Sequence, residues 1–204
     1  HVDGVLAEWT EEQALGMRFA YDDRFLYIGY QRQFGFPGFE NAATAGDFLE
    51  CFRRGNGLEL HFSTEPTADP NRTAPVKGDR RLVICKVDGT LQAVLFDYRR
   101  DSIMPLAKIH YPTFWSDATV DHVEILPGAV IAGREGDTYQ LEAAIPLQAL
   151  GLQPTRIPRI RADFGIDLGD QTGRQTIERA FWSNPNTKLI SDVTSEVTLT
   201  PRRW

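Results

Sequence analysis

The last third of the chain carries the clearest alternation of hydrophobic and polar positions. In residues 138–146 every second side chain falls on one apolar face, formed by Tyr139, Leu141, Ala143 and Ile145. A period of two is typical of an antiparallel strand with one face on a core. Pro146 has no N–H to donate, so we expect strand pairing to end there.

Short turn sequences separate the other strand-like segments. Asp22-Asp23-Arg24 and Asp88-Gly89-Thr90 each join two apolar runs, which predicts two hairpins, and Pro127-Gly128 marks another turn. Strands are predicted over 15–21, 25–31, 58–63, 82–87, 91–98, 120–126, 129–132, 138–146, 159–168, 176–182 and 195–200. No alternation of strand and helix repeats, so the predicted fold is all-β, an antiparallel β-sandwich of the immunoglobulin or jelly-roll kind.

One segment has helical periodicity instead. Apolar residues recur at helical spacing in Ala45, Phe48, Leu49 and Phe52. We therefore expect one short helix within 41–52, with Asn41 or Thr44 available as its cap. Three long connections remain, 32–56, 63–80 and 99–119. The middle one is polar and rich in proline, and we expect it to be solvated, whereas the other two carry aromatic residues.

Composition restricts the function classes. With 204 residues, 42% hydrophobic and 25% charged, the chain is expected to form a single domain over 1–204 with a substantial core. The net charge of -6 argues against a nucleic-acid partner, and no apolar run reaches the length of a membrane span. We expect the chain to be a processed protein or an excised domain, because no signal peptide is recognisable. The two cysteines, Cys51 and Cys85, fit either one disulfide or two free, buried thiols.

Five short motifs occur in order along nearly the whole chain. They are Val2-Asp3-Gly4 with Glu8-Trp9, Asp22 before Leu26-Tyr27-Ile28, Asn56-Gly57-Leu58-Glu59-Leu60, Glu142-Ala143-Ala144-Ile145-Pro146, and Trp182-Ser183-Asn184-Pro185. Together they resemble family 9 carbohydrate-binding modules and the wider sandwich superfamily that includes DOMON-type domains. The resemblance implies a non-catalytic sugar-binding domain of a larger bacterial protein that acts in polysaccharide catabolism. It also implies an extracellular, periplasmic or cell-surface location.

Members of that family clamp a sugar between two aromatic rings and carry structural calcium. At the first clamp position this chain has Arg53, with Phe52 beside it, and Asn56 stands where the family has Asp. The loop of the second clamp, 184–188, has no aromatic residue. The resemblance therefore implies the fold, with the known sugar site lost or rebuilt. A guanidinium fork binds carboxylates and paired hydroxyls, so we expect any bound glycan to be acidic or polar.

A rebuilt site would need a flat ring and planar polar groups. The candidate ligand-binding residues are Trp115, Phe114, Tyr111, Arg53, Asn56 and Trp182. The alternative is that the rings form a hydrophobic lid over one end of the sandwich and that Trp182 packs in the core. An exposed Trp115 would favour ligand binding, and a buried one would favour packing.

Carboxylates gather near the end of the chain, at Asp163, Asp167, Asp170 and Asp192. The glycine-bearing loop that contains Asp167 and Asp170 suits calcium, which prefers hard oxygen ligands. The alternative is a solvated turn in which Asp caps the backbone. Haem is not expected, since Met17 and Met104 are poorly placed as axial ligands.

Catalytic signals are weak. Glu59 and Glu142 are strand residues that could face each other, as a glycosidase requires, but solvated strand faces explain them equally well. Three functions stay open. The first is a sugar-binding module, and the second is a structural or interaction domain that packs against its parent protein. The third and least favoured is a glycoside-processing enzyme, which would need Glu59 or Glu142 in a cleft with a raised pKa.

Overall fold

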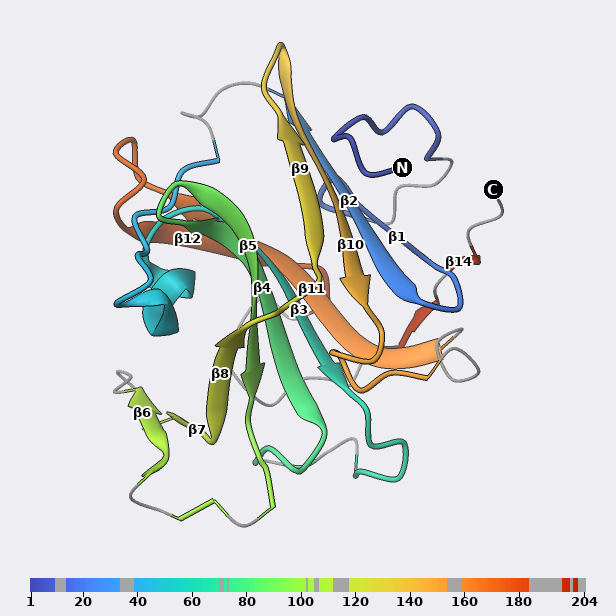
Figure 1. Cartoon of the computed structure of the whole chain (residues 1–204), viewed down its shortest axis with the longest axis vertical. Helices are drawn as coiled ribbons and strands as arrows, with labels where there is room; N and C mark the ends of the chain where they lie inside the picture. Colours follow the sequence, from blue (N-terminus) through green and yellow to red (C-terminus); the bar gives the residue numbers. More distant parts are fainter. Residues whose placement is uncertain are drawn as a thin grey trace.

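Two β-sheets pack face to face in the computed structural model (Figure 1). The structure describes residues 1–9, 14–33, 39–69, 72, 74–101, 103–104, 107–111, 118–153, 159–183, 196–198 and 200–201. The predicted all-β sandwich is confirmed. Within the described residues, no helix is long and apolar enough to cross a lipid bilayer.

The smaller sheet has five strands in the order β14-β1-β2-β10-β9. Their bounds are Met17–Tyr21 for β1, Phe25–Gln33 for β2, Val130–Arg134 for β9, Thr138–Pro146 for β10 and Thr200–Pro201 for β14. The predicted β1–β2 hairpin is confirmed. Asp22 holds its turn, because its Oδ1 accepts the N–H groups of Arg24 and Phe25, each at 2.7 Å.

The larger sheet has seven strands, with β12-β11-β3-β4-β5-β8 in order and β13 paired to β11. Their bounds are Gly57–Ser63 for β3, Asp79–Val87 for β4, Thr90–Asp97 for β5, His122–Ile125 for β8, Arg159–Gly169 for β11, Thr176–Phe181 for β12 and Glu196–Thr198 for β13. The β4–β5 hairpin is confirmed, and Asp88 and Gly89 both take positive φ at its turn. A separate pair, β6 (Ile109–Tyr111) and β7 (Ala118–Val120), lies in the connection 99–119 and was not predicted.

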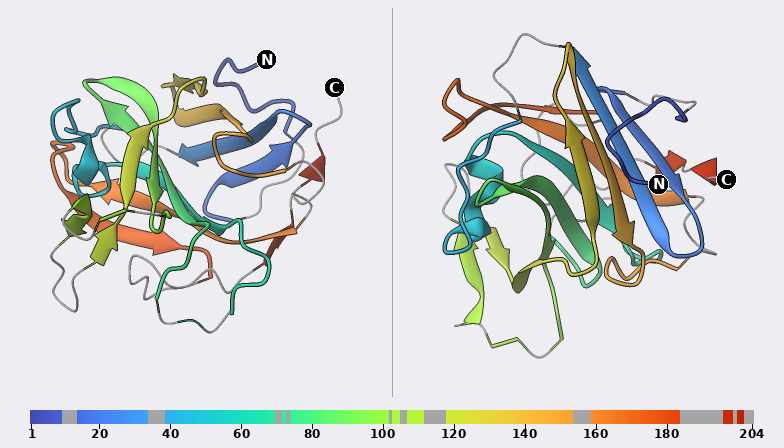
Figure 2. Two further views of the ribbon diagram at one scale, coloured as in Figure 1. Left: turned by 60° about the horizontal axis from the view of Figure 1, so that its bottom comes forward. Right: turned by 45° about the horizontal axis from the view of Figure 1, so that its top comes forward.

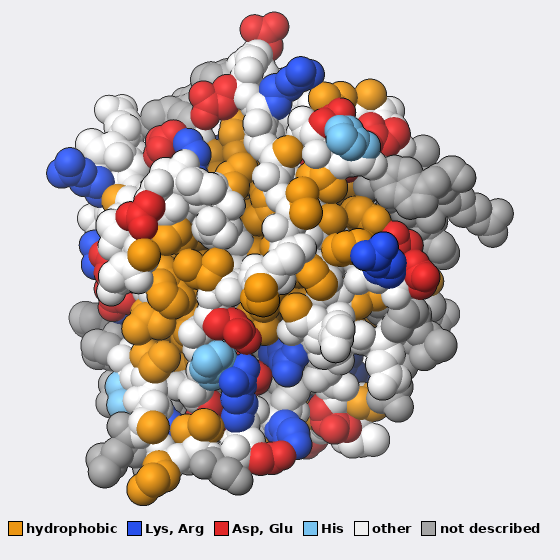
Figure 3. Space-filling view, in the orientation of Figure 1, with side chains coloured by type: hydrophobic (Ala, Val, Ile, Leu, Met, Phe, Trp, Pro, Cys, Tyr) orange, Lys and Arg blue, Asp and Glu red, His pale blue; other side chains and the backbone are white. Residues whose placement is uncertain are grey.

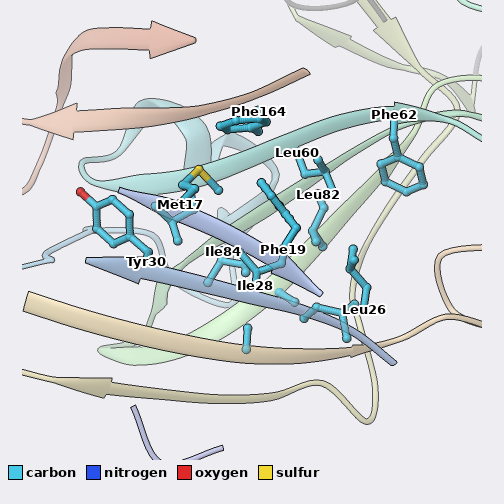
Figure 4. Packing of buried hydrophobic residues seen from close by; sticks show 14 of the residues in the cluster. Met17, Phe19, Leu26, Ile28, Tyr30, Leu60, Phe62, Leu82, Ile84 and Phe164 are labelled. Atoms are coloured by element: carbon cyan, nitrogen blue, oxygen red, sulfur yellow. The ribbon is translucent and has the colours of Figure 1, made fainter. Parts of the chain in front are cut away.

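The core lies between the sheets. Phe19 and Ile28 from one sheet meet Leu60, Leu82 and Phe164 from the other, as Figure 4 shows. The Phe19 and Phe164 rings pack edge to face with centroids 5.0 Å apart. Each of these side chains is at most 4% exposed, and burying one of this size stabilises the fold by about 1.5–3 kcal/mol.

The outer faces of both sheets are covered as well, which corrects the expectation of solvated strand faces. On β10, Glu142 is fully buried beneath the N-terminal segment. The N–H of Asp3 donates to its Oε2 at 3.1 Å and the Trp9 indole N–H to its Oε1 at 3.3 Å. Gly29 makes room for this segment, because a side chain there would meet Leu6 and Trp9. On β3 every residue is buried, Glu59 included.

A short 3₁₀ helix, η1 (Phe48–Arg53), lies on the outer face of the larger sheet, away from the smaller sheet (Figure 2). The predicted helix is therefore present but shorter, with non-helical dihedral angles at Glu50. Its Cys51 and Phe52 pack with Val83 and Cys85 of β4 in a second apolar cluster. Cys51 and Cys85 are both free and buried, so the second of the two interpretations holds for them.

Two connections differ from their expectation. Pro127-Gly128 joins β8 of the larger sheet to β9 of the smaller one, so the turn crosses between sheets. The connection 63–80 is anchored, because the Arg72 side chain is only 7% exposed and donates to both oxygens of Asp79, at 2.9 and 2.6 Å. A paired guanidinium and carboxylate of this geometry is stronger than a neutral hydrogen bond. The segment is therefore held against β4 at this point.

Candidate functional site

Charged side chains gather on the outer face of the larger sheet beside η1. They come from four adjacent strands: Glu59 and His61 from β3, Arg81 from β4, Asp163 and Asp167 from β11, and Arg179 from β12. The sheet register pairs Asp163 with His61, His61 with Arg81, and Asp167 with Arg179. Because side chains alternate along a strand, core residues such as Leu60 and Phe164 leave these charged neighbours on the opposite face.

Glu59 and Arg81 form the centre of this cluster. Arg81 Nε donates to Glu59 Oε2 at 2.8 Å, and Arg81 Nη2 donates to Oε1. His61 Nε2 lies 2.6 Å from the same Oε2. Burial opposes ionisation of Glu59, but attraction to Arg81 and His61 holds its pKa well below the usual range. Glu59 is therefore an ionised carboxylate with both oxygens engaged.

Asp167 lies next to Glu59 and behaves in the opposite way. Its Oδ1 accepts a hydrogen bond from Arg179 Nε at 2.8 Å. Its Oδ2 is buried and receives no N–H or O–H donor from the described residues. Burial and the neighbouring charge of Glu59 raise the pKa of Asp167 well above its ordinary value. Two carboxyl groups in contact hold one proton between them, and here it belongs to Asp167.

Three guanidinium groups surround the phenyl ring of Phe52. The guanidinium carbon of Arg81 lies 4.1 Å from the ring centroid, that of Arg53 5.2 Å and that of Arg179 5.6 Å. Arg81 is buried, whereas the side chains of Arg53 and Arg179 are 31% and 29% exposed. Arg179 Nη2 also donates to the Phe52 carbonyl at 2.6 Å. The surface beside η1 thus presents two partly exposed, planar cations whose positions are fixed by buried partners.

Two residues of the predicted sugar site have structural contacts. Tyr111 is 3% exposed, and its hydroxyl donates to the Leu49 carbonyl at 2.8 Å. Its ring packs on Phe52, as the lid interpretation expects, although Arg53 lies over it at 5.9 Å. Asn56 is 8% exposed, accepts the N–H of Gly169 at 3.0 Å and donates to the Glu40 carbonyl at 3.1 Å. It ties two connections together.

Trp182 follows the end of β12 and is 42% exposed. Its indole stacks on Phe164 with centroids 5.2 Å apart and planes 9° apart. Phe164 belongs to the core between the sheets, so the structure does not bring Trp182 together with Arg53 on one face. Trp115 and Phe114 lie outside the described residues.

The two proposed calcium ligands have different surroundings. Asp170 caps its own turn, since its Oδ1 accepts the N–H groups of Thr172 and Arg174 at 3.1 and 3.0 Å. This matches the alternative interpretation of that loop. Asp167 instead faces Arg179, and Asp192 is outside the described residues. In the described part of the chain, no three His, Cys, Asp or Glu side chains are grouped as metal ligands. Calcium at Asp167 and Asp170 stays a prediction.

Glu59 and Glu142 do not face each other. They lie on the outer faces of different sheets, with the core between them, because each alternates with core residues of its own strand. The pKa of Glu59 is lowered, whereas the enzyme hypothesis needs a raised one. These two residues therefore do not form the pair of carboxylates that a glycosidase requires.

Sequence analysis did not recognise Arg81 or Arg179 as site residues. A signal was present, because ionisable residues interrupt strands that are otherwise apolar, at positions on one face of each strand. Buried charges are rarely tolerated without partners, so such interruptions predict a paired network. No family model, curated protein or solved structure matches the chain. The resemblance to family 9 modules thus remains a prediction.

Proposed function

We propose that this chain is a non-catalytic carbohydrate-binding domain of an exported protein, and that the sugar binds beside η1 over Arg53 and Arg179. The observation that supports this most is the pair of partly exposed guanidinium groups around Phe52. A planar fork of N–H donors suits the paired hydroxyls of a sugar. Donors that are already held in place lose little conformational entropy on binding.

The buried ion network explains why these donors are fixed. Arg179 is held by Asp167 and by the Phe52 carbonyl, and Phe52 is held between Arg81 and the rings of Phe96 and Tyr111. The network therefore connects the core of the second cluster to the exposed surface. Glu59 has both oxygens occupied by Arg81 and His61, which suits a supporting role rather than an acid or nucleophile.

A second candidate is an interaction domain that packs against its parent protein. Apolar side chains favour it: Val130 on the edge strand β9 is 52% exposed and Ile177 on the edge strand β12 is 61% exposed. Figure 3 shows hydrophobic side chains across the middle of one face, framed by charged ones. An apolar area of this kind often marks a protein–protein contact.

A glycan screen followed by calorimetry separates the two candidates. The test variant is Arg53→Ala, and the matched control is Arg54→Ala. Arg54 is the adjacent residue, is 38% exposed and pairs with Asp47 at 3.1 Å. We expect Arg53→Ala to weaken glycan binding about tenfold, the usual size for one charge-assisted contact, with Arg54→Ala close to wild type. If the wild-type protein binds no glycan, the interaction domain becomes the better explanation.

Trp115→Ala tests the remaining predicted ring. If Trp115 contacts the sugar, this variant loses binding while its melting temperature stays within a few degrees of wild type. If the variant unfolds instead, Trp115 packs in the structure and is not a ligand contact.

A further inference from the structure

The charge of the site follows from the groups that face Asp167. These are Glu59 and His61 on β3, Arg81 on β4, Asp163 on its own strand β11 and Arg179 on β12, while η1 adds Phe52 and Arg53. The thiols of Cys51 and Cys85 and the hydroxyls of Tyr98 and Tyr111 also lie in this region and are neutral. The balance of the cluster therefore depends on the protonation of Asp167.

Hydrogen bonding places a proton on Asp167. Glu59 accepts two bonds from Arg81 and contacts His61, so its negative charge is matched by Arg81. The buried Oδ2 of Asp167 has no donor of its own among the described residues and lies against Glu59. Two ionised carboxylates there would repel each other, whereas a protonated Asp167 donates to Glu59. The raised pKa of Asp167 agrees with this arrangement.

Arg179 is then a cation with neutral partners. Among the described residues it donates to Oδ1 of the protonated Asp167 and to the Phe52 carbonyl. Neither acceptor carries a full negative charge, and 29% of the Arg179 side chain is exposed to an incoming ligand. Arg53 adds a second positive charge on the same phenyl ring. A site of this kind attracts an anion, and it is strongest for a planar group with two acceptor oxygens.

We infer that the ligand of this site is an acidic glycan, and that the carboxylate of a uronic-acid residue binds Arg179 with Arg53 beside it. This inference rests on the proposed function, since it names the class of sugar that the same site takes. The carboxylate supplies the negative charge that Asp167 does not. Hydroxyls on the neighbouring carbons remain free to meet the other N–H donors of the two guanidinium groups.

The test compares an oligogalacturonide with its methyl ester, which differs mainly in lacking the negative charges. Isothermal titration calorimetry on the wild-type protein should show the acid binding at least about tenfold more tightly, since a charged acceptor roughly doubles the strength of a hydrogen bond. The affinity for the acid should fall as salt is raised, whereas that for the ester should change little.

Three variants locate the contact. Arg179→Ala should lose about tenfold or more in affinity for the acid and little for the ester. It should still fold, because a protonated Asp167 is not left as an unpaired charge, and circular dichroism checks this. Arg179→Lys keeps the charge but loses the fork, and should lie between wild type and Arg179→Ala. Arg54→Ala is the control for an exposed arginine outside the site.

The outcomes distinguish this inference from the proposed function. If acid and ester bind equally well, the inference is wrong and the sugar-binding function stands. Displacement of the glycan by inorganic sulfate at a similar concentration would also overturn it, since the site would then recognise any anion. If neither compound binds and no other glycan does, the proposed function itself fails.

Discussion

Glu59 and Arg81 face each other across the paired strands β3 and β4 and form an ion pair whose side chains are 0% and 2% exposed. The guanidinium lies on the ring of Phe52, and the carboxylate also contacts His61. Removing two charges from water is costly, and a buried pair repays that cost only with good geometry and further hydrogen bonds. This pair has both, so it can hold the outer face of the sheet in one arrangement.

Loss of the Glu59 charge should be strongly destabilising. Glu59→Gln leaves the buried Arg81 without its counter-charge, so we expect the free energy of unfolding to fall by about 3–5 kcal/mol. Urea denaturation measures this. Glu50→Gln is the control, because Glu50 is 42% exposed and its ion pairs with Arg53 and Arg54 are 3.7 Å long. That change should cost less than about 1 kcal/mol. Equal stability of the two variants would contradict the role given to Glu59.

Asp167→Asn should change the pH dependence of stability. An acid whose pKa is raised by folding binds its proton more tightly in the folded state, so its contribution falls as pH rises from its unfolded pKa through the folded one. Asparagine is neutral throughout and removes this loss. We therefore expect the variant to gain stability relative to wild type as pH increases above about 4, the unfolded pKa of Asp. Parallel pH profiles of the two proteins would count against a protonated Asp167.

Glu59 contributes with the opposite sign. Its pKa is lowered in the folded protein, so its stabilising effect is present above its unfolded pKa and is lost as pH falls. We expect wild-type stability to decrease on acidification below about 4.3, the unfolded pKa of Glu. Glu59→Gln should lose much of this acid dependence when both proteins are followed by thermal denaturation. A variant as acid-sensitive as wild type would assign that dependence to other carboxylates.

Tyr111→Phe should remove one hydrogen bond and leave the packing in place. The lost bond joins the Tyr111 hydroxyl to the Leu49 carbonyl at the start of η1. We expect a loss of about 1 kcal/mol in the free energy of unfolding, the usual value for a single hydrogen bond. Tyr111→Ala should cost about 3–5 kcal/mol, because it also leaves a cavity beside Phe52. A Tyr111→Ala variant as stable as Tyr111→Phe would show that the ring does not pack.

Chelation tests the calcium prediction. If calcium binds Asp167 and Asp170, excess chelator lowers the melting temperature, because a ligand of the native state stabilises it by mass action. Elemental analysis of the purified protein gives the metal content independently. An unchanged melting curve together with no bound metal would eliminate a calcium site at these residues.

The local features of the fold could be read from the sequence by itself. The hairpin turns at Asp22 and at Asp88-Gly89 were predicted correctly, and so were the bounds of β10. Each of these depends on residues close together in the chain, through the φ that glycine accepts, the hydrogen bonds of an aspartate or the missing N–H of proline. The sandwich class followed from the number and spacing of such segments.

Tertiary structure decided everything that depends on which distant segments meet. It directed Pro127-Gly128 between the sheets, covered Glu142 with the N-terminal segment, and brought Asp167 of β11 beside Glu59 of β3. Pairing of distant strands must repay the entropy of closing long loops, and its register depends on the whole core. A strand pattern shows that a residue lies on the outer face, but only the packing of the other elements decides whether that face is solvent or a buried ion network.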